Sequence, residues 1–383
     1  MLINGAKNLV KVISAYFGKP NELTDVNWQE VFVASKVHNV TSIFYEAVKD
    51  RDDVPKEVLN DAKKQTLALI NQQILQEYYT EKVFEKLEEK GIKYLPLKGY
   101  IMRRYYPRPD LRNSCDSDVL YDAKKEEQIA PIMQELGFNS DDLGEAWING
   151  VVRIEMHDKL FSDKEIHYKY YDDVLGWDRL NTENKIRCDF TDEDYYVYFL
   201  AHASKHFINA GFGIRTIMDI YVFNKEKPNL DKEYVKKELE KLGIYKFSKC
   251  LEKIADIWFK EGESDEEIKL LEEYVLTSGA YGIKEHGAVM RFSGKNKIAN
   301  RTKKRYFLRA LFPSYKNMKT SYTVLRKAPI LLPFVWVYRW FKAILKKRYR
   351  IGEIKKEGDL INDKNSAEIK KLLEITDFPD YNL

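Results

Sequence analysis

The stretch 112-RNSCDSDVLYD-122 places two aspartates, Asp116 and Asp118, one residue apart and directly before an apolar run. In a β-strand, residues i and i+2 point to the same face, so the two carboxylates would stand about 7 Å apart with Ser117 turned to the opposite face. Two such carboxylates repel each other unless a cation neutralises them. Since Mg²⁺ prefers carboxylate and phosphate oxygens, the pair predicts a magnesium site, with a solvated acidic loop as the alternative.

Strand patterns gather around this stretch. The apolar run 92–97 predicts a short strand that leads into a helix near residue 98. A helix is expected over 124–136, closed by Gly137. The segment 151–157 alternates as a strand, which places four residues on one face: Val151, Arg153, Glu155 and His157.

Helical periodicity dominates both flanks of these strands. We therefore expect an α+β fold, in which a small mixed β-sheet core is flanked by N-terminal and C-terminal helical regions. The predicted organisation has five parts: an N-terminal helical region (1–90), an α/β core (91–190), a C-terminal helical domain (191–285), a basic amphipathic segment (286–352) and a charged tail (353–383).

Composition narrows the class of protein. The 383 residues hold no run of about 18 apolar residues, so no membrane-crossing helix is predicted. Lys7 and Lys11 interrupt the apolar face of the N-terminus, which favours an amphipathic helix over a signal peptide. Three widely spaced cysteines suggest neither a disulfide framework nor a zinc site, so the cytoplasm is the expected location.

Positive charge is concentrated near the C-terminus. Residues 286–352 include eighteen Lys and Arg and no Asp or Glu; without these eighteen, the remaining 46 basic residues face 60 acidic ones. On a helix over 334–350, one stripe is basic (Arg339, Lys342, Lys346, Arg350) and another is apolar (Phe334, Val337, Tyr338, Phe341, Leu345). The segment predicts packing on the core, peripheral contact with the inner face of a membrane, or, less favoured, binding to nucleic acid.

Phosphoryl chemistry at the acidic pair needs further groups. Glu155, on the strand that carries His157, is a candidate third carboxylate. Two metal ions held by these carboxylates would stabilise the attacking and leaving oxygens. Lys98 and Gly99, at the start of a helix, offer an ammonium group and a closely approaching backbone for phosphates. In phosphatases and glycosyltransferases that use a D-x-D pair, the apolar strand precedes the acids, whereas here it follows them.

Five short motifs then resemble a known family. They are 97-LKG-99, 106-YP-107, 112-RNSCDSDVL-120, 155-EMH-157 and 202-HASKH-206, followed by 215-RTIMD-219. Over about 90–225 their order is similar to that of the bacterial "uncharacterised nucleotidyltransferase" family of the DNA polymerase β superfamily. Lys98-Gly99 stands where that superfamily usually has Gly-Ser.

The resemblance implies specific roles. Asp116 and Asp118 would bind the metal ions, Glu155 would be the third metal ligand and would activate the acceptor, and Lys98 and Gly99 would hold the triphosphate. Four further residues become candidates for the nucleotide site: Arg112, His157, Arg215 and Asp219.

Plainer readings of the same residues stay open. Arg112 could instead anchor its loop, and His157 could be a buried, hydrogen-bonded histidine. Arg215 and Asp219 could form an i, i+4 helix pair. His202 and His206 have zinc-ligand spacing but no evident third ligand, so packing or nucleotide contact is favoured.

These patterns together predict an Mg²⁺-dependent (alternatively Mn²⁺-dependent) nucleotidyltransferase. It would move a nucleoside monophosphate from a nucleotide triphosphate, ATP among the candidates, to an acceptor hydroxyl or phosphate and release pyrophosphate. The residue patterns do not name the acceptor; the family resemblance suggests a glycan precursor, a small molecule or a peptide. A catalytically idle nucleotide-binding or membrane-associated scaffold is the alternative, and a metal-dependent phosphatase is the third.

Overall fold

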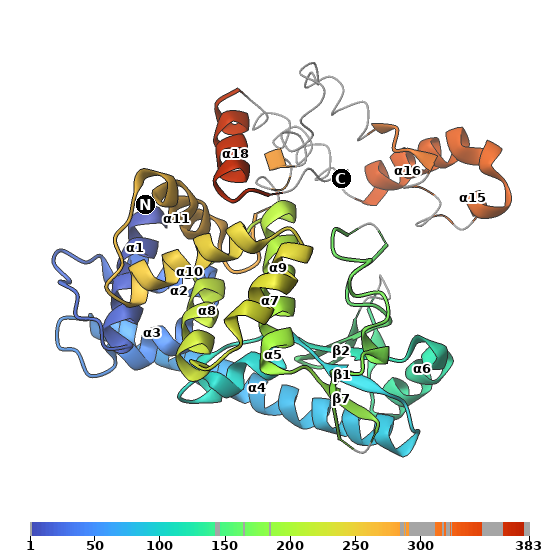
Figure 1. Cartoon of the computed structure of the whole chain (residues 1–383), viewed down its shortest axis with the longest axis horizontal. Coiled ribbons are helices and arrows are strands. Elements are labelled where there is room, and N and C mark those ends of the chain that lie inside the picture. The colour runs from blue at the N-terminus through green and yellow to red at the C-terminus, as the bar shows by residue number, and fades with distance from the viewer. Residues whose placement is uncertain are drawn as a thin grey trace. The chain divides into compact units, whose positions relative to one another are not determined.

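The computed structural model describes residues 2–141, 146–163, 165–183, 185–283, 287, 289, 290, 311–315, 318, 322, 324–346 and 363–378. The chain forms two compact units. The first comprises Met1–Phe207, Gly211–Gly282 and Ile375–Pro379, and the second comprises Ile208–Ala210, Ile283–Glu374 and Asp380–Leu383. The predicted α+β class is confirmed: the first unit holds one mixed sheet flanked by helices (Figure 1). The five-part organisation stays a prediction.

Four helices precede the sheet: α1 (Leu2–Tyr16), α2 (Trp28–Val37), α3 (Thr41–Val48) and α4 (Lys56–Glu89). The side chain of Asn27 caps α2 by accepting a hydrogen bond from the Glu30 amide. Figure 1 shows α4 running from the other N-terminal helices to the sheet and along one face of the strands. The amphipathic helix expected at the N-terminus is α1.

The sheet has seven strands: β1 (Tyr94–Pro96), β2 (Ser117–Tyr121), β3 (Asn139–Ser140), β4 (Trp147–Asn149), β5 (Val152–His157), β6 (Asn181–Glu183) and β7 (Arg187–Asp189). Their order is β3-β4-β5-β2-β1-β7-β6. The central strand β2 runs antiparallel to β1 and parallel to β5. All five residues of β2 are buried, as a central strand requires. The strands expected over 92–97 and 151–157 are therefore present as β1 and β5, and the apolar run after the acidic pair lies in β2, which begins at Ser117.

Short helical elements connect the strands. They are α5 (Lys98–Met102), α6 (Glu126–Glu135) and single 3₁₀ turns at Arg103–Tyr105, Pro109–Leu111, Ala123–Lys125 and Val174–Gly176. Gly137 follows α6 with φ of 80°, a left-handed conformation that suits glycine after a helix. The helix expected over 124–136 is thus confirmed.

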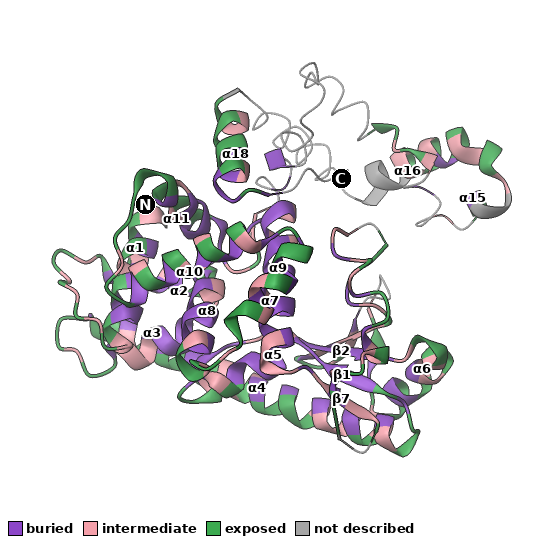
Figure 2. Ribbon diagram, viewed as in Figure 1, coloured by how far each residue is buried: buried purple, intermediate pink, exposed green. Residues whose placement is uncertain are grey.

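Five helices follow the sheet: α7 (Asp192–Asn209), α8 (Ile214–Glu226), α9 (Lys232–Lys241), α10 (Tyr245–Phe259) and α11 (Glu266–Ser278). The turn between α7 and α8 contains Gly211 with φ of 92°, a left-handed conformation that favours glycine. The N-terminal helix docks on this group, because Ser14 Oγ donates to the carbonyl of Trp258, 2.5 Å away. Figure 2 shows buried residues along α7, α8 and the strands.

The second unit includes α15 (Val324–Lys327), a 3₁₀ turn at Pro329–Leu331, α16 (Leu332–Lys346) and most of α18 (Asp363–Ile375). Its small apolar core contains Met318, Leu325 and Val335. Within the described part of the chain, we find no helix with the length and apolar character needed to cross a membrane.

Candidate active site

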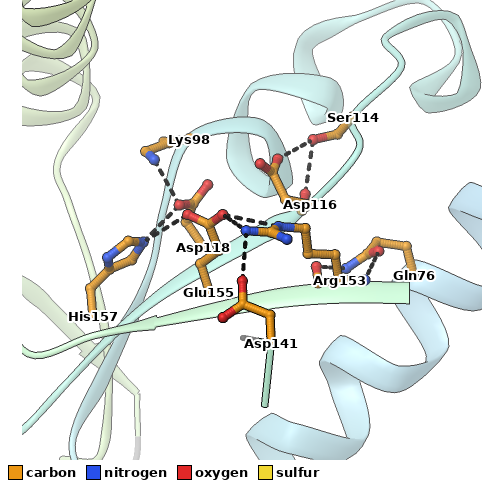
Figure 3. Close-up of polar contacts among 9 residues, drawn as sticks. All are labelled: Gln76, Lys98, Ser114, Asp116, Asp118, Asp141, Arg153, Glu155 and His157. Atoms are coloured by element: carbon orange, nitrogen blue, oxygen red, sulfur yellow. Dashed lines mark hydrogen bonds and ion pairs between the residues drawn. The ribbon is translucent and has the colours of Figure 1, made fainter. Parts of the chain in front are cut away.

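Two parallel strands bring the acidic residues together. In the register of β2 with β5, Asp118 lies opposite Glu155 and Leu120 lies opposite His157. Because side chains alternate along a strand, Asp118, Glu155 and His157 share one face of the sheet. A carboxylate oxygen of each acid and an imidazole nitrogen all lie within 4.8 Å of one another (Figure 3). The three residues could therefore hold one metal ion.

Two basic side chains and an imidazole lie beside these acids. Lys98 Nζ lies 2.6 Å from Asp118 Oδ1, and His157 Nε2 lies 2.7 Å from the same oxygen. Arg153 donates to Glu155 Oε1 from Nε and from a terminal nitrogen, both at 3.1 Å, and lies 3.6 Å from Asp141. The carboxylates of the site thus have an ammonium group, a guanidinium group and an imidazole beside them (Figure 3).

The proton affinities of the site follow from burial and these charges. Burial disfavours the charged form of Asp118, but the Lys98 ammonium and the hydrogen bond from His157 outweigh it and hold the pKa of Asp118 below its usual range. Burial and then the charge of Asp118 raise the pKa of Asp116 and that of Glu155. Asp118 is therefore the permanent anion of the site, whereas Glu155 accepts a proton more readily.

Asp116 lies just before β2 and is held locally. Ser114 Oγ donates to the backbone carbonyl of Asp116 at 2.9 Å and lies 3.3 Å from its carboxylate. The negative charge of Asp116 acts on Glu155 and on Lys98. Asp116 is not one of the three residues whose ligand atoms converge, and its role as a metal ligand stays a prediction.

A polar row on α4 sets the register of β2 and β5 from behind. Ser117 faces away from the acids, and its hydroxyl accepts from Thr80 Oγ1 at 2.9 Å and from Gln76 Nε2 at 3.0 Å. Gln76 also bonds the backbone of Arg153, donating to its carbonyl and accepting from its amide. Sequence reasoning missed this row. The available signal was three polar residues, Gln73, Gln76 and Thr80, spaced along one face of a predicted helix, and all three are buried in the structure.

Helix α8 anchors the loop that leads to Asp116. Arg112 makes a two-pronged ion pair with Asp219, both bonds at 2.9 Å, and both side chains are buried. Tyr106 donates to Asp219 at 2.7 Å, and Arg215 donates to the carbonyl of Asn113 at 3.0 Å. Asp219 thus pairs with Arg112 in another element rather than with Arg215 in its own helix.

Lys98 and Gly99 meet the loop from the other side. Lys98 has φ of 46°, a left-handed conformation that costs energy for a residue with a side chain, and its carbonyl accepts from the hydroxyl of Tyr195. A Cβ at Gly99 would lie 2.7 Å from Arg112 and 2.9 Å from Ser114. The Lys-Gly pair is therefore shaped to fit between α7 and the Arg112 loop.

Two histidines on α7 border this charge cluster. The rings of His202 and His206 meet edge to face at 4.4 Å. Burial and then the positive charge of Lys98 lower the pKa of both, that of His206 to about 4. Both are therefore neutral near pH 7, and their imidazoles offer hydrogen bonds without adding charge. Among the described residues, neither His202 nor His206 belongs to a group of side chains that could hold a metal ion.

The fold and the site together define a class of protein. Two carboxylates and an imidazole that converge from parallel strands, with lysine and arginine beside them, could hold a divalent cation. A family model described as "uncharacterised nucleotidyltransferase" matches residues 24–260, and the chain belongs to this family. No curated protein and no solved structure matches it.

Proposed function

We propose that the protein transfers a nucleoside monophosphate from a nucleotide triphosphate to an acceptor hydroxyl or phosphate. The acceptor oxygen would bond to the α-phosphorus, the bond from that phosphorus to the bridging oxygen would break, and pyrophosphate would leave. The pairing of Asp118 with Glu155 across β2 and β5 carries this proposal, together with membership of the family.

The donor set fits a magnesium ion. Asp118 and Glu155 offer the hard oxygen ligands that Mg²⁺ prefers, and Mn²⁺ accepts the same oxygens and also an imidazole such as that of His157. In this proposal Asp116 completes the set from the start of β2. A bound divalent ion would supply positive charge at the phosphate oxygens.

The protein's own groups take the remaining tasks in this proposal. Glu155 would receive the proton of the acceptor hydroxyl, since its pKa is raised by burial and then by the charge of Asp118. Lys98 would move between Asp118 and the β- and γ-phosphates, which its flexible stem and ammonium group allow. Gly99 would let the phosphates approach the backbone. Arg112, Asp219 and Arg215 would hold the Asp116 loop in position through their mutual contacts.

The decisive experiment uses the full chain with Mg²⁺, each of the four α-labelled ribonucleotide triphosphates and a cell extract as the source of acceptor. We expect label on an extract component, pyrophosphate release, and loss of both in Asp118→Asn. Asp158→Asn is the matched control, because Asp158 is an exposed carboxylate just beyond β5. It should transfer label at the wild-type rate.

Other outcomes separate the alternatives. Nucleotide binding that needs Mg²⁺ and Asp118 but gives no transfer would favour an idle nucleotide-binding scaffold. Release of inorganic phosphate without nucleotide consumption would favour a phosphatase. The absence of both nucleotide binding and nucleotide transfer would overturn the proposed function.

A further inference from the structure

The second unit has an apolar inner side built around two tryptophans. Trp336 Nε1 donates to the carbonyl of Pro313 at 3.0 Å, and Trp340 Nε1 donates to that of Leu311 at 2.9 Å. The ring of Phe312 meets both indoles edge to face, with centroids 5.2 and 5.0 Å apart. These contacts fix which side of α16 turns toward its own unit.

The opposite side of α16 and of the turn before it is apolar and exposed. Ile330 is 84% exposed, Phe334 71% and Phe341 61%. Val337 and Tyr338 are also exposed. Phe334, Val337, Tyr338 and Phe341 have the spacing of a single face of α16, and Ile330 adds an exposed apolar side chain in the turn before it. We call these five residues the apolar stripe.

The apolar stripe lies within the strongly basic segment 286–352, which has eighteen Lys and Arg and no acidic residue. A protein face of this composition combines burial of apolar side chains with attraction to negative charge. A second copy of the chain is a poor occupant, because two segments of the same high positive charge repel each other. Nucleic acid would satisfy the charge but would leave isoleucine, valine and phenylalanine exposed.

We propose that the apolar stripe inserts into the surface of an anionic lipid bilayer. Helix α16 would lie in the plane of the interface, with Ile330, Phe334 and Phe341 among the acyl chains. The positive charge of segment 286–352 would attract the anionic headgroups. An amphipathic helix with basic residues and large apolar side chains has the composition that binds such a surface. This inference is independent of the reaction at Asp118 and would hold for an inactive protein.

The test is flotation of the full-length protein with vesicles of phosphatidylcholine alone or with a third of phosphatidylglycerol. We expect at least about tenfold tighter binding to the anionic vesicles at low salt, and weaker binding as salt rises. Ile330→Ser/Phe334→Ser/Phe341→Ser should weaken that binding by about tenfold or more, because three exposed apolar side chains no longer leave water on binding.

The matched control removes three apolar side chains that are also exposed but lie on α4, as Leu67→Ser/Ile74→Ser/Tyr78→Ser. This variant should bind anionic vesicles like the wild type. Circular dichroism of both variants checks that they are folded. Binding by the wild type that is absent, equal for both vesicles, or reduced equally by both triple variants would overturn the proposal. Vesicle-independent self-association, or tight binding to an oligonucleotide in place of vesicles, would also overturn it.

Discussion

Asp118 is the residue on which the charges of the site converge. A buried carboxylate is costly unless it is paired, and Asp118 Oδ1 has both Lys98 and His157 within 2.7 Å. Glu155, on the neighbouring strand, is less buried and pairs with Arg153. The two acids therefore differ in their surroundings: Asp118 is buried between Lys98 and His157, whereas Glu155 is partly exposed beside Arg153.

Glu155→Gln tests the proposed metal site at this scale. Loss of one ligand charge should weaken Mn²⁺ binding by about tenfold or more, measured by isothermal titration calorimetry. Asp158→Asn removes an exposed carboxylate close by and should leave the affinity unchanged. Equal affinities for the two variants would mean that Glu155 does not hold the ion.

Gly99→Ala tests the close approach of Lys98-Gly99 to the Arg112 loop. The new methyl group would lie 2.7 Å from a guanidinium nitrogen of Arg112 and 2.9 Å from Ser114 Oγ, so one of them must shift. We expect a loss of about 1–3 kcal/mol in the free energy of unfolding. Urea denaturation measures it, and an unchanged midpoint would show that the loop yields freely.

At the scale of elements, helix α8 acts as the anchor of the segment before β2. Its Asp219 holds Arg112, its Arg215 holds the carbonyl of Asn113, and Asn113 in turn donates to Ser42 of α3 at 2.9 Å. The motifs RNSCDSD and RTIMD therefore function as one assembly. Arg112 and Asp219 can be charged although they are buried, because each is the ion-pair partner of the other.

Asp219→Ala should destabilise the contact between α8 and the Arg112 loop. It leaves the Arg112 guanidinium buried without its partner, which costs about 3–5 kcal/mol of folding free energy. Asp53→Ala breaks an Arg–Asp pair on the surface and should cost below about 1 kcal/mol. Calorimetric melting of both variants gives the comparison.

A nucleotide-binding role for Asp219 makes a different prediction. Such a role would leave the melting temperature of Asp219→Ala close to that of the wild type and weaken only nucleotide affinity. The double variant Arg112→Leu/Asp219→Leu should be more stable than Asp219→Ala, because it leaves no unpaired buried charge.

At the scale of the whole molecule, buried histidines make the first unit sensitive to acid. His38 joins three helices, since its Nδ1 accepts from the Ile214 amide and its Nε2 lies 3.2 Å from the carbonyl of Leu276. Burial lowers the pKa of His38 to about 4 and that of His167 to about 3. Each binds a proton in the unfolded chain near its ordinary pKa of 6.5 but not in the folded one.

The free energy of unfolding should therefore be highest above about pH 7.5 and fall as the pH decreases toward 4. Each of these histidines should lower the free energy of unfolding by about 1 kcal/mol between about pH 7.5 and about pH 5.5. Urea denaturation at several pH values measures this change. His38→Gln should show a shallower pH dependence than the wild type. A stability that rises on acidification would contradict the neutral, buried state of these rings.

Local patterns in the sequence predicted the helical flanks and three of the seven strands, β1, β2 and β5, but not β3, β4, β6 or β7. Periodicity is a property of neighbouring residues, so the helices around 1–90 and 193–280, the strands β1, β2 and β5, and the outward turn of Ser117 from the acids were all predictable. The acidic pair also predicted a cation site, because unpaired adjacent carboxylates are unfavourable in any fold. In the structure the ligand atoms that converge belong to Asp118, Glu155 and His157.

Only the tertiary structure decided which strands pair and which charged side chains contact each other. The side-by-side position of Asp118 and Glu155 depends on which strands pair, and the sequence does not show that β7 lies beside β1 or that Gln76 locks β2 to β5. Asp219 had Arg215 one helical turn away, yet it pairs with Arg112, whose side chain is buried against it. The physical reason is that burial makes a charge pair selective: many charges along a chain could meet in water, but in the interior only the pair that packing brings together is retained.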